Sequence, residues 1–325
     1  MIRWPNLDSF RINSADPYHT YPLCTPMPTV TAASRRPALI ALALLTLIWS
    51  YNWIVMKQVL RYSGPFEFSA LRYVLGTGVL FSMLLLRRKS LRPPPLLQTA
   101  LIGIAQTMGF QALVQYALVA GGAGKTALLA YTMPFWVVLL AWLLLSERPG
   151  ARLWLGLGVA ACGLLLVLEP WLGIGNANSS MLAIAGGLCW AIGVVLSKRL
   201  FQRGGISALS LTAWQMLIGT LGLVLVALIA DEPPIEWSHF FIGALAYNAV
   251  LSSGFAWLMW SYVVDRLPAN IAGLSSLVIP IAGIGLAWVL LGERPTLPES
   301  AGIVLIGVAL AIVNLRRLPG VRRAG

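Results

Sequence analysis

The chain has 325 residues, of which 58% are hydrophobic and only 10% are charged, whereas about a quarter of the residues in an average soluble domain are charged. A soluble globular fold is therefore excluded, because it could not bury so much apolar surface. The formal net charge of +12 does not indicate nucleic-acid binding, since the basic residues form short groups between long apolar runs, without interleaved aromatic residues.

Residues 1–35 are polar and proline-rich, and they contain no apolar stretch like that of a signal peptide. We predict a disordered cytoplasmic tail here. Met27 shortly precedes the basic pair that leads into the first apolar run, so translation from Met27 and translation from Met1 both fit the sequence. A second, basic cytoplasmic tail is predicted for residues 317–325.

Ten apolar runs follow, each long enough to cross a bilayer as a helix and bounded by proline, glycine or charge. They are predicted near residues 38–57, 67–86, 96–119, 123–145, 152–169, 180–200, 207–230, 239–264, 268–291 and 298–315. The Gly- and Asn-rich residues 170–179 are predicted to link the first five spans to the second five.

The two sets of five spans repeat one another. Thr132–Pro149 reads TMPFWVVLLAWLLLSERP and returns as Val278–Pro295, VIPIAGIGLAWVLLGERP, with nine of eighteen positions identical and an offset of 146 residues (278 − 132). A repeat of that length means two copies of one structural unit, and two homologous membrane halves are typical of transporters.

The repeat extends over most of the spans. Further matching pairs are Trp49…Lys57 with Trp190…Lys198, Ser69-Ala-Leu-Arg72…Gly76-Thr77 with Thr212-Ala-Trp-Gln215…Gly219-Thr220, Gly156 with Gly302, and Tyr116 with Tyr262.

The basic residues predict how the spans are oriented. With the N-terminus in the cytoplasm, sixteen Lys and Arg residues of the proximal tail, the loops and the C-terminus lie inside, and four lie outside: Lys57, Arg61, Lys125 and Arg294. Because each half has an odd number of spans, the second half must be inverted. The sequence therefore predicts an all-α membrane protein with ten transmembrane helices, arranged as inverted five-helix repeats at 36–169 and 180–316.

Together these features resemble the drug/metabolite transporter superfamily, specifically its ten-span EamA-type members. The likeness is carried by Trp49-Ser-Tyr-Asn52…Lys57, Arg72, Tyr131-Thr-Met-Pro134 and the two Glu-Arg-Pro endings, and it covers roughly residues 36–315. It implies two inverted five-helix units around a central cavity, and often export of amino acids, other metabolites or drugs. One departure is Gln215, which stands where the first half has Arg72.

Polar and aromatic residues inside the predicted spans are candidates for a substrate-binding site, because in lipid such groups face protein or a water-filled cavity. The eighth span has the fullest set, at helical spacing along one face: Asn248, Ser252, Phe255, Met259 and Tyr262. The other candidates are Trp49, Asn52, Trp53, Gln111, Gln115, Tyr131, Trp190, Ser275 and Ser276. Packing between helices is the alternative role of each.

Five further residues are candidates for structural or gating roles. Arg72 is a charge inside the second span, so it needs a partner or access to water. Glu67 and backbone carbonyls of the first span are the possible partners. Pro134 and Pro280 are expected to bend the fourth and ninth spans and so shape the cavity. Glu147 and Glu293 end these two spans on opposite sides of the membrane, and we interpret them as helix-end clamps.

No span contains a histidine or a pair of carboxylates, since His19 lies in the tail, His239 at a span end, and the acidic residues at span ends or in loops. We therefore expect no enzymatic activity, no metal site and no cofactor. The expected partners are a small-molecule substrate and the lipid bilayer, with no nucleic acid, and the protein is expected to be a monomer or homodimer.

The sequence thus predicts a secondary transporter in the inner membrane of a bacterium, with both termini cytoplasmic. We expect it to export small neutral or zwitterionic metabolites such as amino acids, by alternating access around a central cavity. Multidrug efflux is the alternative within this class. Other classes are a lipid flippase or non-transporting membrane protein on the same fold, and a membrane-embedded enzyme, which would need a catalytic arrangement inside a span.

Overall fold

The computed structural model describes residues 32–121, 123–172, 176–291 and 296–314, and these residues form helices, turns and short connections without a strand. The first half contains α1 (Ala32–Val59), α2 (Pro65–Leu86), α3 (Leu96–Ile102), the π-helix η1 (Gly103–Gly109), α4 (Phe110–Ala120), α5 (Ala123–Ala130), α6 (Met133–Leu145) and α7 (Ala151–Leu168). After the 3-10 turn η2 (Pro170–Leu172), the second half contains α8 (Ala177–Gln202), α9 (Ala208–Ile229), α10 (His239–Tyr247), the π-helix η3 (Asn248–Ala256), α11 (Trp257–Arg266), α12 (Ala269–Ser275), α13 (Val278–Leu291) and α14 (Leu297–Asn314).

The ten predicted spans are present. In the described parts of the chain, nine helical segments are long and apolar enough to cross a membrane, and Leu297–Val313 of α14 is a shorter apolar helix. Of the predicted N-terminal tail, residues 1–31 lie outside the described residues, whereas residues 32–35 already belong to α1, which continues through Pro37. Residues 317–325 also lie outside the described part.

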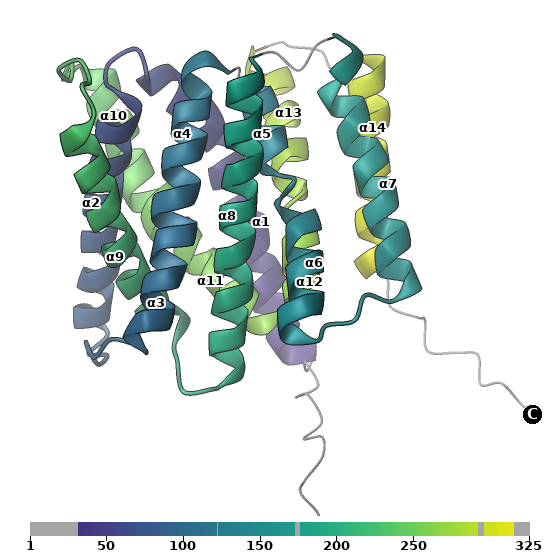
Figure 1. Ribbon diagram of the computed structural model, residues 1–325, viewed down its shortest axis with the longest axis horizontal. Coiled ribbons are helices and arrows are strands. Elements are labelled where there is room, and N and C mark those ends of the chain that lie inside the picture. The colour runs from purple at the N-terminus through teal and green to yellow at the C-terminus, as the bar shows by residue number, and fades with distance from the viewer. Residues whose placement is uncertain (1–31, 122, 173–175, 292–295, 315–325) are drawn as a thin grey trace, which may run out of the picture.

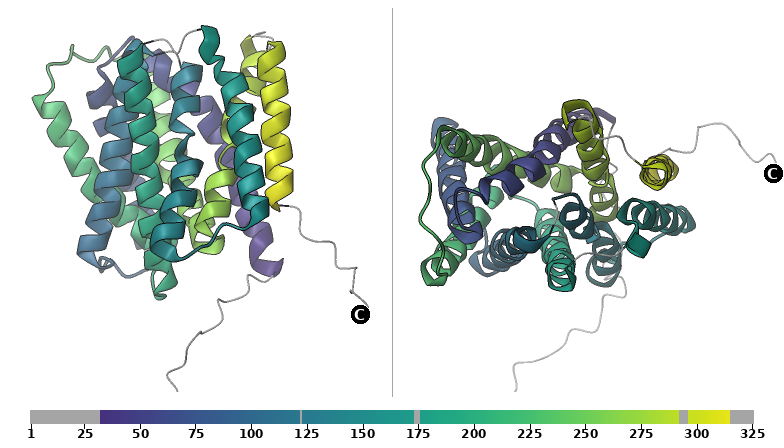
Figure 2. Two further views of the ribbon diagram at one scale, coloured as in Figure 1. Left: turned by 45° about the vertical axis from the view of Figure 1, so that its right-hand side comes forward. Right: turned by 90° about the horizontal axis from the view of Figure 1, so that it is seen from above.

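The helices stand side by side as one bundle, and α1 begins and α14 ends at its lower end in Figure 1. At one edge of the bundle α7 packs along α14, and this pair stands apart from the other helices at the right of Figure 1; Figure 2 shows α14 at the edge of the bundle in both views. These two helices are the fifth and tenth spans, so they are the last spans of the two repeats.

The contact between α7 and α14 is symmetric about a two-fold axis. A Cβ atom added to Gly302 would lie 2.5 Å from the carbonyl oxygen of Gly163, and the matching approach joins Gly156 to the carbonyl oxygen of Ala309 at 3.4 Å. Residues that occupy the same position in the two repeats are called repeat mates here. Gly302 is the repeat mate of Gly156, and Ala309 is the repeat mate of Gly163, so the two contacts are equivalent. Glycine is favoured at positions 163 and 302, because a side chain at either would meet the backbone of the other helix within 3 Å.

Both halves also have a π-helical segment in the same place. Residues 103–109 form η1 in the third span, and η3 in the eighth span covers the residues 146 positions later, 249–255, together with one more at each end. A π-helical turn contains an extra residue and often lies at a functional site. It also rotates the residues that follow it relative to an ideal α-helix.

The fourth and ninth spans are broken rather than bent. Helix α5 ends at Ala130 and α6 begins at Met133, with Pro134 in its first turn; likewise α12 ends at Ser275 and α13 begins at Val278 before Pro280. Each span is thus interrupted at the expected place, by a short turn next to the proline. The chain makes a short turn before each proline, because proline lacks an N–H group and suits the first turn of a new helix.

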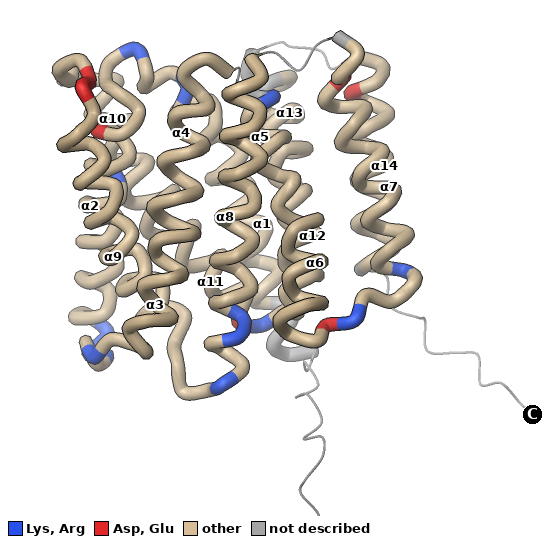
Figure 3. The backbone as a smooth tube through the Cα atoms, viewed as in Figure 1, with Lys and Arg blue, Asp and Glu red and all other residues tan. Residues whose placement is uncertain are grey.

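Charge is distributed unequally between the two ends of the bundle. The described Lys and Arg residues gather at the end where α1 begins (Figure 3): Arg87, Arg88, Lys89, Arg92, Arg148, Arg152, Lys198, Arg199, Arg203 and Arg266. The opposite end has Lys57, Arg61 and Lys125 among the described residues, beside the acidic Glu67, Asp231, Glu232 and Glu236.

Candidate functional site

A small cavity lies between helices of both halves, with about 370 Å³ of empty space including its opening. Its lining residues are Trp49, Asn52, Trp53, Met56, Arg72, Tyr73, Phe110, Gln111, Val114, Tyr131, Trp190, Ser252 and Trp257. Trp49, Trp190 and Ser252 each stand near the middle of their span, so the cavity reaches half of the depth of the bundle. From there it extends toward the end where α1 ends, where Met56 lies.

The structure brings together seven of the fourteen candidate residues at this cavity: Trp49, Asn52, Trp53, Gln111, Tyr131, Trp190 and Ser252. Arg72, which we considered for a structural or gating role, is also part of the lining. These residues come from six different spans, so the cavity is formed by the tertiary packing of both repeats.

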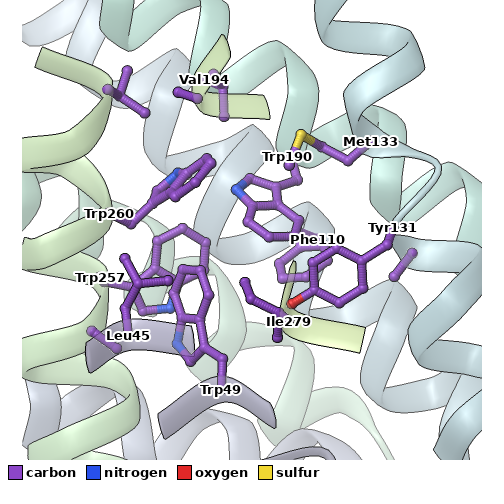
Figure 4. Close-up of a cluster of buried hydrophobic side chains, with 14 of the residues drawn as sticks. Leu45, Trp49, Phe110, Tyr131, Met133, Trp190, Val194, Trp257, Trp260 and Ile279 are labelled. Atoms are coloured by element: carbon purple, nitrogen blue, oxygen red, sulfur yellow. The ribbon is translucent and has the colours of Figure 1, made fainter. Parts of the chain in front are cut away.

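Aromatic rings form the largest part of the wall. Trp49 and Trp190, which are repeat mates, have ring centroids 5.6 Å apart, and Trp257 lies 5.0 Å from Trp49 and 6.0 Å from Trp190. Figure 4 shows these three rings facing one another together with Trp260, with Phe110 and Tyr131 beside Trp190. Such a cluster presents both apolar faces and N–H groups, which suits an amphipathic ligand.

Trp49 also ties the first span to the π-helical segment of the eighth. Its indole Nε1 donates a hydrogen bond to the carbonyl oxygen of Ser252, at 3.2 Å. At the next residue, the Oγ of Ser50 donates to the carbonyl oxygen of Ile279 at 2.7 Å, just before Pro280. The first span is thus fixed against the irregular backbone of two spans of the second half.

Arg72 is fully buried, with 1% of its surface exposed. Its Nη1 donates to Oδ1 of Asn248 at 2.9 Å, its Nη2 donates to Oε1 of Gln111, and the rings of Phe68 and Tyr73 lie 5.5 and 5.0 Å from the guanidinium. The partners expected from the sequence, Glu67 or carbonyls of the first span, are therefore wrong. Two side-chain amides from the third and eighth spans bind the guanidinium instead.

The repeat mate of Arg72 occupies an equivalent environment. Gln215 accepts a hydrogen bond at its Oε1 from the hydroxyl of Thr107, at 2.8 Å. Thr107 lies in η1 and Asn248 in η3, so in each half this side chain binds the π-helical segment of the other half.

The expected stripe along the eighth span is interrupted. Asn248 is buried against Arg72, and Ser252 lines the cavity, but Phe255, Met259 and Tyr262 are only half-buried and are not among the lining residues. The π-helical turns of η3 rotate the following residues, so that Trp257 and Trp260 take the buried face. Residues at α-helical spacing therefore no longer share one face of the span beyond Ser252.

The remaining candidate residues lie away from the lining. Gln115 is fully buried one turn beyond Gln111, and its amide makes no hydrogen bond to the described residues. Ser275 and Ser276 are buried at the break of the ninth span, where Ser276 donates to the carbonyl oxygen of Gly273 at 2.7 Å.

Sequence reasoning missed five lining residues: Met56, Tyr73, Phe110, Val114 and Trp257. Met56 continues the helical spacing of Trp49, Asn52 and Trp53, and Val114 follows Gln111 by one turn. Both could therefore have been predicted by extending the cavity-facing side of each helix by one turn. The position of Trp257 depends on η3, which has no clear sequence signal.

The family model for the EamA-like transporter family matches residues 36–169 and again residues 178–315. The chain belongs to the EamA-like transporter family. It is accordingly a multi-pass membrane protein, and the all-helical fold with two repeats agrees with that membership.

Several relatives of this family are similar over most of their length. The uncharacterized transporter YoaV of Bacillus subtilis is 29% identical over 271 residues, which cover 80% of this chain and 91% of YoaV. A probable amino-acid metabolite efflux pump of Salmonella typhimurium is 28% identical over 291 residues, covering 86% and 95% of the two chains. One crystal structure, 22% identical, superposes with a TM-score of 0.73 over 86% of this chain and 98% of its own, which supports the fold.

Several charged side chains of this EamA-like chain bind helix ends. Lys57 donates through Nζ to the carbonyl oxygens of Leu118 and Gly121 at 2.6 and 2.9 Å, at the C-terminus of α4. Its repeat mate Lys198 donates to those of Val264 and Asp265 at 3.2 and 3.0 Å, at the C-terminus of α11. In both halves a lysine therefore neutralises the partial negative charge of a helix end.

Glu147 binds the opposite kind of helix end. Its carboxylate accepts hydrogen bonds from the backbone N–H groups of Ala269 and Asn270, at 3.3 and 3.4 Å, and so caps the N-terminus of α12. This contact joins the end of the fourth span to the start of the ninth. Glu293 lies outside the described residues.

Proposed function

We propose that this protein is a secondary transporter that exports small neutral or zwitterionic metabolites, such as amino acids, by alternating access around the cavity. The observation that supports this most is the position of the cavity. It lies at the contact between two inverted repeats, with the mates Trp49 and Trp190 on its wall. Binding sites of repeat-built transporters lie near the middle of the membrane at that contact.

The lining supports an amphipathic substrate. Its aromatic rings offer apolar area, Asn52, Gln111 and Ser252 offer hydrogen-bonding groups, and none of its residues is acidic. An organic dication would require a carboxylate at this depth, and a sugar phosphate would require several cations. The relatives named probable amino-acid metabolite efflux pumps, from Salmonella typhimurium and Escherichia coli, agree with such a substrate.

We propose that the end of the bundle where α1 begins is cytoplasmic and that the membrane is the bacterial inner membrane. This proposal rests on the unequal distribution of Lys and Arg residues between the two ends. In that orientation the cavity extends toward the outside. Reporter fusions at both termini and at residue 171 test the orientation: the terminal reporters should act in the cytoplasm and the internal one outside. Activity of all three on one side would overturn it.

Transport by purified protein in liposomes tests the function. Vesicles loaded with an unlabelled amino acid should accumulate the labelled compound by exchange, for one or more members of a panel of apolar and aromatic amino acids. Trp190→Ala, Tyr131→Ala and Asn248→Ala should each reduce the rate, whereas Trp288→Ala, on an exposed face of α13, should not.

Two outcomes would contradict this function. If only phosphorylated compounds or organic dications are exchanged, the proposed substrate class is wrong. Exchange of cationic drugs would instead support multidrug efflux. If labelled phospholipid crosses the membrane while no soluble compound does, the protein is a flippase. Normal transport by all three cavity variants would show that the substrate passes elsewhere.

A further inference from the structure

Arg72 is a buried charge without a counter-charge among the described residues. The side chain is 1% exposed, and the partners of its guanidinium are the neutral amides of Asn248 and Gln111 and the faces of two aromatic rings. The described part of the chain contains one ion pair, between Arg266 and Asp265, far along the chain from Arg72. A buried charge is costly unless it is paired, so this position favours binding of an anion.

The guanidinium of Arg72 also keeps donors that make no hydrogen bond to the described residues. Arginine has five N–H donors, and the two amides use two of them. The Nε of Arg72 makes no hydrogen bond to the described residues, and Arg72 lines the cavity. Asn248 and Gln111 therefore hold the guanidinium in one orientation at the cavity and leave its Nε without a partner.

The same cavity contains an acceptor without a partner. Oδ1 of Asn52 makes no hydrogen bond to the described residues, although the residue is only 5% exposed. An unpaired buried acceptor suits the N–H groups of an ammonium. The wall thus combines a cationic donor, a neutral acceptor and the rings of Trp49, Trp190 and Trp257.

We propose that Arg72 is the carboxylate subsite of this cavity and that the substrates are monocarboxylates with an apolar or aromatic side group, apolar α-amino acids above all. This inference rests on the proposed transport function and narrows its substrate class. The carboxylate binds Arg72, an amino group binds Oδ1 of Asn52, and the apolar group packs against the tryptophans. A single guanidinium matches one negative charge, whereas a phosphate with two would remain partly uncompensated.

The repeat mate offers a matched substitution. Gln215 occupies the position of Arg72 in the second half, is equally buried at 2% exposure, and accepts a hydrogen bond from Thr107. A glutamine is therefore compatible with this environment. Arg72→Gln should fold and insert, because it removes the charge and keeps a hydrogen-bonding side chain.

The test is exchange in liposomes with matched pairs of compounds: phenylalanine with phenylalaninamide, and leucine with leucinamide. Each amide keeps the amino group and the side group but lacks the carboxylate. The wild-type protein should exchange the acids at least ten times faster than the amides. Arg72→Gln should lose at least nine-tenths of the exchange of the acids, whereas Arg61→Gln, at an exposed position outside the bundle core, should not.

Equal exchange of acids and amides by the wild-type protein would overturn the carboxylate subsite and leave the transport function standing. Failure to exchange any monocarboxylate would overturn both. If Arg72→Gln does not fold, Arg72→Lys keeps the charge and should still prefer acids to amides. Loss of that preference in a folded Arg72→Lys protein would count against the subsite.

Discussion

The hydroxyl groups of Thr77 and Thr220 lie 3.4 Å apart, although the two residues occupy the same position in the two halves of the chain. Two equivalent residues can meet only beside the axis that relates the halves. Trp49 and Trp190 are mates as well and also meet, at 5.6 Å between ring centroids. The cavity that Trp49 and Trp190 line is therefore close to this axis, where both repeats contribute to its wall.

A cysteine pair tests the axis. Thr77→Cys with Thr220→Cys, in a protein whose Cys24, Cys162 and Cys189 are replaced by alanine, should form a disulfide on mild oxidation, because the side chains face each other. A protease site introduced into residues 173–175 separates the two halves. After cleavage the halves should remain joined until a reductant is added. Separation without reductant would contradict the packing, and either single cysteine variant is the control.

Replacing the glycines at the contact between α7 and α14 by larger residues should destabilise the protein. Gly163→Val or Gly302→Val places a side chain where backbone atoms lie within 3 Å, so each should destabilise the protein by about 1–3 kcal/mol. Gly158→Val and Gly307→Val are controls on the same helices, since nothing lies within 4 Å of a Cβ there. Thermal unfolding in detergent measures the difference. Similar unfolding midpoints for all four variants would show that the helices do not pack closely.

The two lysines at the helix ends should contribute similarly to stability. Lys57→Met and Lys198→Met each keep an apolar stem but leave carbonyl oxygens of α4 or α11 without their donor. Each should cost about 1–3 kcal/mol, the range for hydrogen bonds to charged groups. Arg61→Met, an exposed residue near Lys57, should change the unfolding midpoint little. A lysine variant as stable as Arg61→Met would show that the helix end is satisfied without it.

Replacing the prolines at the two broken spans should affect transport more than insertion. Pro134→Ala and Pro280→Ala each restore an N–H group in the first turn of α6 or α13, which favours a continuous helix across the break. The variants should reach the membrane in nearly normal amounts and transport slowly. Normal turnover numbers for both, measured per molecule of inserted protein, would restrict the prolines to a role in packing.

Span positions and the inverted repeat were predictable from the sequence because both depend on local features. Runs of about twenty apolar residues mark membrane helices, and the returning Glu-Arg-Pro and Trp…Lys patterns mark the repeat. The mates Lys57 and Lys198 illustrate this: their equal spacing from Trp49 and Trp190 is visible in the sequence, and both bind helix ends in the structure.

The details of the cavity were not predictable because they depend on irregular backbone and distant contacts. The π-helical turns of η3 move Trp257 into the lining and Met259 out of it, without a sequence signal for the extra residue. The partners of Arg72 come from residues 39 and 176 positions away. Similarly, the carboxylate of Glu232 caps α2 by accepting from the N–H groups of Phe66 and Glu67, at 2.9 and 2.7 Å, across a gap of more than 160 residues.

Labelling of a single cysteine in the lining tests whether the cavity opens to the two sides of the membrane in turn. Ser252→Cys, in the protein without its three native cysteines, places a thiol at mid-depth in the lining. A membrane-impermeant maleimide applied to one side of oriented vesicles, with or without an exchanged amino acid, measures the access from that side.

We predict labelling from either side, slowed by the amino acid in both cases, because one cavity opens to the two sides in turn. Labelling from one side only, with no effect of any exchanged amino acid, would contradict it.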